Sequence, residues 1–257
     1  MRVRGYAPAT PCWSVLSSGD PAAAEAFYCD VFGWTSTRTE DGATVFLLRD
    51  QVVAGLADSG GNRTAWLTYI ATEDADATAA LVAEHGGTVL QPSADILPRG
   101  RAALLADPAG GVFGVWQRVR FAGAQVANEP GAICWSETVT WDVAATAAFY
   151  GKIFGWIEQD GTADVDAHYH EWIASNRVVG GISPMGEQYP PGTPQHWRTI
   201  FSIEDCAAFI ARTRELGGQV LAGPVDAGIG HAAHVIDPTG GAFLVIELLP
   251  ELRHLLG

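Results

Sequence analysis

The chain has 257 residues, of which 48% are hydrophobic, so it can bury one large core or two ordinary ones. Its net charge of −14 argues against a nucleic-acid backbone or an anionic membrane surface as partner. The N-terminus lacks an apolar signal segment, and no window approaches about eighteen uncharged apolar residues, so we expect a soluble, cytoplasmic protein. Without C-x-x-C spacing, the cysteines are expected to be small buried residues: Cys12, Cys29, Cys134 and Cys206.

The first elements form a strand, a helix and two more strands. Residues 11–17 have a strand pattern, and Asp20 followed by Pro21 marks a helix start. The helix pattern ends at Gly33, and β-like runs follow at 44–50 and 51–57. Aromatic residues of this helix share a stripe at near-helical spacing, which predicts that they pack against a sheet rather than act in catalysis.

The same order of elements then starts again. Residues 66–71 read as a strand, residues 73–85 as a helix, and Gly86 with Gly87 as its end. Strand patterns follow around residues 88–92, 101–107 and 111–117. The repeating unit is therefore β-α-β-β-β.

Whole segments of the sequence recur about 120 to 130 residues later. The sequence "FYCDVFGW" at 27–34 returns as "FYGKIFGW" at 149–156, residues 65–89 match 196–220, and residues 100–116 match 230–246. A period of this length indicates domain duplication rather than a solenoid. We predict two homologous domains, 1–120 and 131–257, joined by a linker at 121–130.

These motifs resemble the vicinal oxygen chelate superfamily, which includes glyoxalase I, bleomycin-resistance proteins and extradiol dioxygenases. The resemblance rests on F-Y-x-x-x-F-G-W, the Gly-Gly helix ends and D-P-x-G-G-x-F, each present twice, and it covers nearly the whole chain. More narrowly, the chain resembles two-domain actinobacterial glyoxalase-like proteins. It implies an α+β fold in which four β-α-β-β-β units form two cupped mixed sheets, each with a ligand cavity. It does not specify the chemistry, because this fold hosts lyases, dioxygenases, epimerases and drug-binding proteins.

The resemblance also implies four strand positions in each domain at which metal-dependent members hold a divalent ion. Carried over to this sequence, they are Trp13, Gly55, Leu67 and Gly114 in the first domain and Trp135, Gly181, Arg198 and Leu244 in the second. None of these is His, Glu, Asp or Cys, whereas a metal site needs at least three N, O or S donors. We therefore expect no metal at the family position and no cofactor.

Histidines gather in the second domain and leave one alternative open. His168 and His170 share one side of a predicted strand, and with Glu171 nearby they could hold a metal elsewhere. The competing interpretation is that they face solvent on a half-exposed strand or titrate in a polar pocket. His231 and His234 are spaced so that they lie on opposite faces of their strand.

Alternation along the strands predicts what lines each cup. The first cup is expected to be apolar and aromatic, suited to a flat ligand, with Trp13, Tyr69 and Trp116. The second is expected to contain Trp135, Glu137 and Arg198. Two charges inside a cup form an ion pair that closes the sheet, are solvated by an open cleft, or meet a ligand.

Two functional hypotheses follow, and a third ranks below them. The first is a metal-independent protein that binds a small aromatic or polycyclic metabolite through Trp13, Tyr69, Trp116, Trp135 and Arg198, for sequestration, resistance or secondary metabolism. The second is an enzyme, such as a lyase, isomerase or tailoring catalyst, with Glu137 and His231 as acid and base. The third is a metal-dependent glyoxalase or dioxygenase, which the missing donors disfavour. The expected partner is a small molecule, and the expected state is monomer or homodimer.

Overall fold

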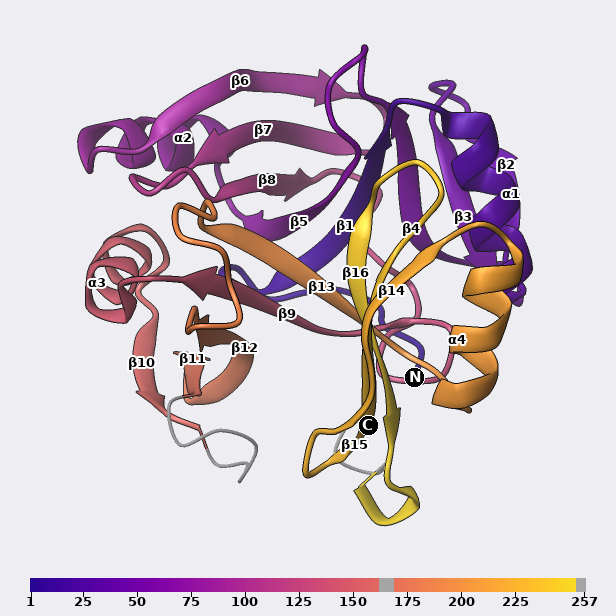
Figure 1. Cartoon of the computed structure of the whole chain (residues 1–257). Coiled ribbons are helices and arrows are strands. Elements are labelled where there is room, and N and C mark those ends of the chain that lie inside the picture. Colours follow the sequence, from indigo (N-terminus) through magenta and orange to yellow (C-terminus); the bar gives the residue numbers. More distant parts are fainter. Residues whose placement is uncertain (162–168, 253–257) are drawn as a thin grey trace.

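The computed structural model describes residues 1–161 and 169–252 and contains two mixed eight-stranded sheets (Figure 1). The first sheet has the order β2-β3-β4-β1-β5-β8-β7-β6, and the second repeats it as β10-β11-β12-β9-β13-β16-β15-β14. Each sheet is built from two β-α-β-β-β units joined side by side. The predicted α+β fold with two cupped sheets is confirmed.

The elements of the first domain follow the predicted order. They are β1 (Pro11–Ser18), α1 (Pro21–Phe32), β2 (Thr35–Arg38), β3 (Thr44–Leu48), β4 (Gln51–Asp58), β5 (Ala65–Thr72), α2 (Ala75–Glu84), β6 (Thr88–Ile96), β7 (Gly100–Ala106) and β8 (Val112–Arg118). The short strand β2 is the element that the sequence pattern did not locate.

The second domain repeats this order. Its elements are β9 (Ile133–Thr140), α3 (Val143–Phe154), β10 (Ile157–Asp160), β11 (His170–Ala174), β12 (Arg177–Pro184), β13 (His196–Ser202), α4 (Cys206–Glu215), β14 (Gln219–Asp226), β15 (Gly230–Ile236) and β16 (Ala242–Leu248). No helix in the described residues is long and apolar enough to cross a membrane.

Local sequence signals fix the ends of the two helices that carry the repeated phrase. The side chain of Asp20 accepts a hydrogen bond from the Ala23 amide at the start of α1, and Asp142 does the same at the start of α3. Gly33 and Gly155 end these helices with φ of 66° and 68°, a left-handed conformation that glycine adopts without a steric penalty.

The repeated aromatic phrase joins the two domains. The Tyr28 hydroxyl donates to Asp237 Oδ2 at 2.8 Å, and the Tyr150 hydroxyl donates to Asp107 Oδ2 at 2.9 Å. Each of these tyrosines therefore binds the aspartate of the other domain's D-P-x-G-G motif. Both are fully buried among other aromatic rings, which confirms the predicted packing role.

The helices also pair across the domains. Figure 1 shows α1 beside α4 and α2 beside α3, and each pair makes direct contacts. The main cores are formed in this way: one contains Phe27 and Phe201, the other Phe113 and Phe149. The concave faces of the two sheets are left for the cups.

All four cysteines are free, and Cys12, Cys134 and Cys206 are buried while Cys29 is half-buried. The prediction of small packing residues is confirmed for the three buried ones.

Candidate functional site in the second cup

The second cup is the concave face of the sheet β9–β16, and its strand register brings Glu137 and Arg198 together. Glu137 on β9 pairs with Arg198 on β13 and with Gly181 on β12. Since side chains alternate along a strand, all three positions share one face of the sheet. The predicted inward orientation of both charged residues is confirmed.

Glu137 and Arg198 form a buried ion pair. The Glu137 side chain is 4% exposed and that of Arg198 is 14% exposed. Arg198 Nε donates to Glu137 Oε1 at 2.6 Å, and its Nη2 contacts the same oxygen. Arg198 also donates to the hydroxyls of Tyr189 at 3.0 Å and Ser183 at 3.3 Å. The guanidinium is therefore held in place from three strands or loops.

The second carboxylate oxygen of Glu137 is bound by a tyrosine. The Tyr169 hydroxyl donates to Glu137 Oε2 at 2.8 Å and accepts from Trp135 Nε1 at 2.7 Å. Burial, and then the charge of Glu137, raise the pKa of Tyr169 well above its usual value, so the hydroxyl stays protonated. A Cβ at Gly181 would lie 1.8 Å from this hydroxyl, so only glycine leaves room for it.

Two histidines add uncharged polar groups near the ion pair. His234 pairs with Leu244 across β15 and β16, which places it on the cup face. Burial, then the charge of Arg198 and, when His196 is protonated, the charge of that ring lower the pKa of His234 to about 4. Burial also lowers the pKa of His196. Both imidazoles are therefore neutral at pH 7. His196 Nδ1 lies 2.9 Å from the Pro194 carbonyl oxygen and donates to it, which leaves Nε2 of this ring as an acceptor.

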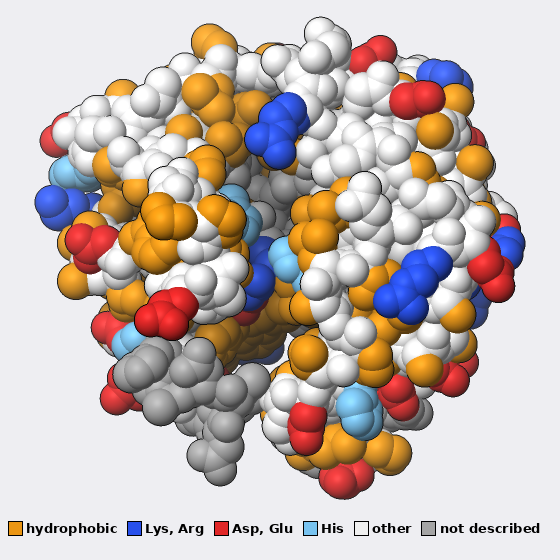
Figure 2. Space-filling view, viewed as in Figure 1, with side chains coloured by type: hydrophobic (Ala, Val, Ile, Leu, Met, Phe, Trp, Pro, Cys, Tyr) orange, Lys and Arg blue, Asp and Glu red, His pale blue; other side chains and the backbone are white. Residues whose placement is uncertain are grey.

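Apolar side chains form the rest of the cup. Cys134, Ile200, Ile246 and Leu248 are buried together there, with Trp135 and Leu244 packed against them. Figure 2 shows a hollow in this face of the molecule, with histidine and basic side chains at its walls and hydrophobic ones deeper inside. The cup therefore combines an apolar surface with one cluster of oriented polar groups, which is the usual character of a small-molecule site.

The first cup, the concave face of the sheet β1–β8, is filled by its own side chains. Trp13 and Trp116 are buried, and both pack edge-on against Phe121, at centroid distances of 4.9 and 5.9 Å. The Tyr69 ring lies directly over Gly114, where a Cβ would come within 2.2 Å of it. The predicted aromatic lining is present, and its role in ligand binding stays a prediction.

Two of the histidines singled out in the sequence, His231 and His170, do not lie beside Glu137. His231 pairs with Glu247 and is exposed, on the face opposite to His234, so it does not lie with Glu137. His170 Nδ1 lies 2.5 Å from Glu158 Oε1 and 3.6 Å from Asp160 Oδ1. The alternation along β11 puts this group on the face opposite to Tyr169. His168 lies outside the described residues.

The second cup does not fit the divalent ion that the fold family implies. The positions carried over from metal-dependent members, Trp135, Gly181, Arg198 and Leu244, offer no metal ligand. Glu137 is adjacent, but both its oxygens are bound, one of them by a guanidinium that would repel a cation. Among the described residues, the group of three His, Cys, Asp or Glu side chains with ligand atoms within 4.8 Å of one another is Glu158, Asp160 and His170, outside the cup.

Sequence reasoning found Trp135, Glu137 and Arg198 but missed several residues that surround them. Tyr189 lies in the loop between β12 and β13, where no strand period applies. Tyr169 precedes β11 and could have been found from its alternation with Glu171. His231 and His234 lie on opposite faces of β15, and the D-P-x-G-G turn after this strand fixes which of them faces the cup. The turn is closed by the bond from Asp237 N to Gly241 O at 2.9 Å, and counting back from it places His234 opposite Leu244.

The two cupped sheets are the fold that the repeated motifs predict for a tandem glyoxalase-like protein, and a comparison with family models identifies the same superfamily. The model of the Glyoxalase/Bleomycin resistance protein/Dioxygenase superfamily matches residues 13–141 and 138–245. The chain belongs to this superfamily.

Two similar proteins come from streptomycetes. The chain is 36% identical to "Anthracycline biosynthesis protein DauV" of Streptomyces sp. (strain C5), over 95% of this chain and 94% of that protein. It is 35% identical to "Anthracycline biosynthesis protein DnrV" of Streptomyces peucetius, again over 95% and 94%.

Solved structures share the fold at low sequence identity. The Mn(II)-bound glyoxalase from Novosphingobium aromaticivorans has a TM-score of 0.62 at 18% identity, over 94% of this chain and 83% of that one. The 2,3-dioxygenase LapB from Pseudomonas sp. KL28 has a TM-score of 0.63 at 14% identity, over 92% and 91%.

Proposed function

We propose that the second cup binds a planar polycyclic aromatic metabolite of the anthracycline type, without a metal ion, in secondary metabolism or in sequestration of such a compound. The observation that carries this proposal is the Glu137–Arg198 pair, a buried and fully hydrogen-bonded ion pair in one cup only. The two streptomycete relatives, both named for anthracycline biosynthesis, support the choice of ligand class.

The two sides of the cup have different roles in this proposal. The apolar side, with Ile200, Leu244 and Ile246, covers a flat ring system and excludes water. On the polar side, His234 can donate to a carbonyl oxygen or accept from a phenol of the ligand, and Nε2 of His196 can accept from a phenol. Glu137 orients Arg198 and thereby fixes the polar side before the ligand enters, which reduces the entropic cost of binding.

An acid–base enzyme is the second candidate. It is favoured by one observation: a tyrosine kept protonated on Glu137 lies in the same cup as neutral His234. In that case neutral His234 takes a proton from one atom of the substrate and returns it to another, as in an isomerisation, and the Tyr169–Glu137 pair orients the reacting group. Turnover of the bound compound distinguishes this candidate from pure binding.

The test compares matched changes in the two cups with 1,8-dihydroxyanthraquinone as the probe. Tyr169→Phe removes one hydroxyl from the second cup, and Tyr69→Phe removes one from the first. We expect Tyr169→Phe to weaken binding about tenfold, because Glu137, which orients Arg198, loses the hydrogen bond from this hydroxyl. A factor of ten corresponds to about 1.4 kcal/mol. Tyr69→Phe should leave the affinity unchanged, and so should addition of EDTA.

A double change tests the ion pair without leaving a buried charge. Glu137→Val with Arg198→Leu installs the residues of the first cup, Val15 and Leu67, which pair with each other in the same register. A folded double variant should lose binding. The proposal is wrong if this variant binds as the native protein does, or if Tyr69→Phe is the change that abolishes binding.

A further inference from the structure

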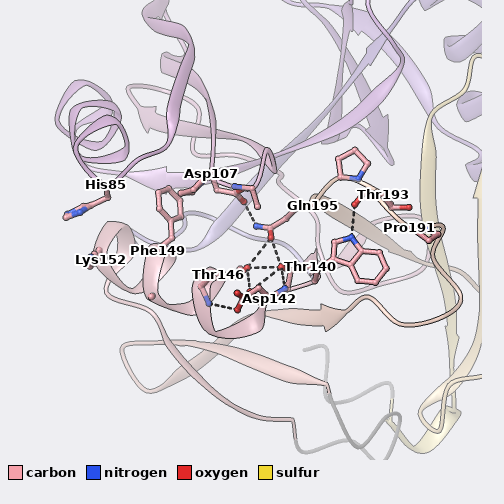
Figure 3. A pocket seen from close by; sticks show the side chains of 17 residues that line it. His85, Asp107, Thr140, Asp142, Thr146, Phe149, Lys152, Pro191, Thr193 and Gln195 are labelled. Carbon is pink, nitrogen blue, oxygen red and sulfur yellow. Dashed lines mark hydrogen bonds between the residues drawn. The ribbon is translucent and has the colours of Figure 1, made fainter.

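A second, separate cavity lies between the two domains. It has a volume of about 1020 Å³ and is lined by the end of β9, one face of α3, residues 191–195 of the loop between β12 and β13, the β7–β8 turn and the C-terminal end of α2 (Figure 3). This volume is at the upper end of the range of small-molecule sites. It lies outside both cups, so neither the fold family's usual ligand position nor the proposed function accounts for it.

The cavity depends on features that the first domain lacks. The loop between β12 and β13 spans residues 185–195, whereas its counterpart spans 59–64 and is five residues shorter. Trp141 occupies the position of Gly19, is 49% exposed, and donates from Nε1 to the Thr193 carbonyl at 2.8 Å. The longer loop and the tryptophan together form one wall.

The polar side chains on the floor of the cavity bond one another. Gln195 Nε2 donates to Asp107 Oδ2 at 2.5 Å, which links the two domains. The Gln195 carbonyl oxygen accepts from Thr140 Oγ1 at 2.5 Å and from Thr146 Oγ1 at 3.1 Å. The site is therefore preformed, and a ligand would be held by the apolar walls and by the groups at the rim.

Two basic groups lie at one end of the cavity. Lys152, the only lysine of the chain, and His85 both line it, and Figure 3 shows them on the same side. No ion pair of Lys152 occurs within residues 1–161 and 169–252. The counterpart of Lys152 in the first domain is Asp30, so the charge is reversed at this cavity in a chain that is otherwise strongly acidic.

We propose that this cavity binds an aromatic carboxylate. The ring system packs against Trp141 and Pro191 at one end and extends toward Phe149, and the carboxylate meets Lys152 and His85 at the end beside Phe149 (Figure 3). The loop 185–195 separates this site from the second cup, since Tyr189 bonds Arg198 in the cup while Pro191 to Gln195 line the cavity. The protein would thus hold two small molecules on opposite sides of one loop.

The experiment uses the single lysine as a local reporter. The full-length protein is acetylated with an N-hydroxysuccinimide ester of acetate, with and without anthraquinone-2-carboxylate, and the modification of Lys152 is measured by mass spectrometry. The N-terminal amine serves as the internal reference. We expect saturating probe to slow acetylation of Lys152 at least fivefold and to leave the reference unchanged, while neutral 2-(hydroxymethyl)anthraquinone gives little protection.

Matched variants check the location. Trp141→Gly installs the first-domain residue and should abolish the protection of Lys152. Lys152→Asp should weaken calorimetric binding of the probe at least tenfold, compared with Arg214→Asp, which makes the same charge change on an exposed position of α4. Absence of protection in the native protein would overturn the proposal. So would equal protection by the neutral analogue, or equal weakening by Lys152→Asp and Arg214→Asp.

Discussion

The two cups descend from one pattern of strands but now have opposite contents. At corresponding positions the first cup has Val15 beside Leu67, and the second has Glu137 beside Arg198. The first cup is closed by aromatic rings, with Phe121 of the linker inserted between Trp13 and Trp116. The same strand pattern thus supports an apolar, aromatic cup in one copy and a cup with a buried polar cluster in the other.

The largest expected effect comes from leaving one half of the buried ion pair alone. Glu137→Val should lower the free energy of unfolding by about 3–5 kcal/mol, because the Arg198 charge stays buried without its partner. Adding Arg198→Leu should recover most of this loss, since an apolar pair is tolerated at the same place in the first cup. Urea unfolding of both variants measures this, and a double variant as unstable as the single one would contradict it.

The next effect is a loss of stability in acid that the second cup alone should show. The folded protein holds the pKa of His234 at about 4, below the value of about 6.5 in an unfolded chain. As the pH falls from 6.5 to 4 the unfolded state binds a proton that the folded state refuses, so stability is lost by up to about 3 kcal/mol.

His234→Leu, which installs the residue found at Leu104 in the first cup, should reduce the pH slope of unfolding between pH 4 and 6.5. His231→Leu, on the exposed face of the same strand, is the control and should leave the slope as it is. If both variants keep the full slope, other groups cause the acid sensitivity.

The filled state of the first cup can be tested by exchanging one residue pair. Tyr69 and Gly114 are register partners there, and Ile200 and Leu244 take the same places in the second cup. Gly114→Leu should cost about 1–3 kcal/mol through overpacking against the Tyr69 ring. Tyr69→Ile in the same chain should restore stability, as measured by thermal unfolding. A Gly114→Leu variant with native stability would show that the ring moves freely.

These contrasts also show what could be predicted from the sequence. The repeat and the alternation along strands were sufficient for the fold and for the inward positions of Glu137 and Arg198, because period and register are local properties. Tyr189 and one wall of the interdomain cavity belong to an irregular loop, whose conformation cannot be predicted from a helical or strand periodicity. The bond from Tyr28 to Asp237 joins residues 209 positions apart. This bond depends on how one domain packs on the other, which the pattern of each domain's sequence does not specify.

The smallest effect concerns the two tyrosines that join the domains. Removing either hydroxyl, by Tyr28→Phe or Tyr150→Phe, deprives a buried aspartate of a hydrogen bond and a buried indole N–H of its acceptor. The two sites differ in what remains. Asp107 Oδ2 keeps the bond from Gln195 Nε2, whereas all other described bonds of Asp237 go to its Oδ1.

We therefore expect Tyr28→Phe to be less stable than Tyr150→Phe by about 1 kcal/mol, the net value of one such bond. Chemical unfolding of the two variants in parallel measures the difference. Gln195→Met should remove it when combined with Tyr150→Phe, because Asp107 Oδ2 then loses both side-chain donors. Equal stabilities of the two single variants would mean that Gln195 does not compensate for the lost hydroxyl.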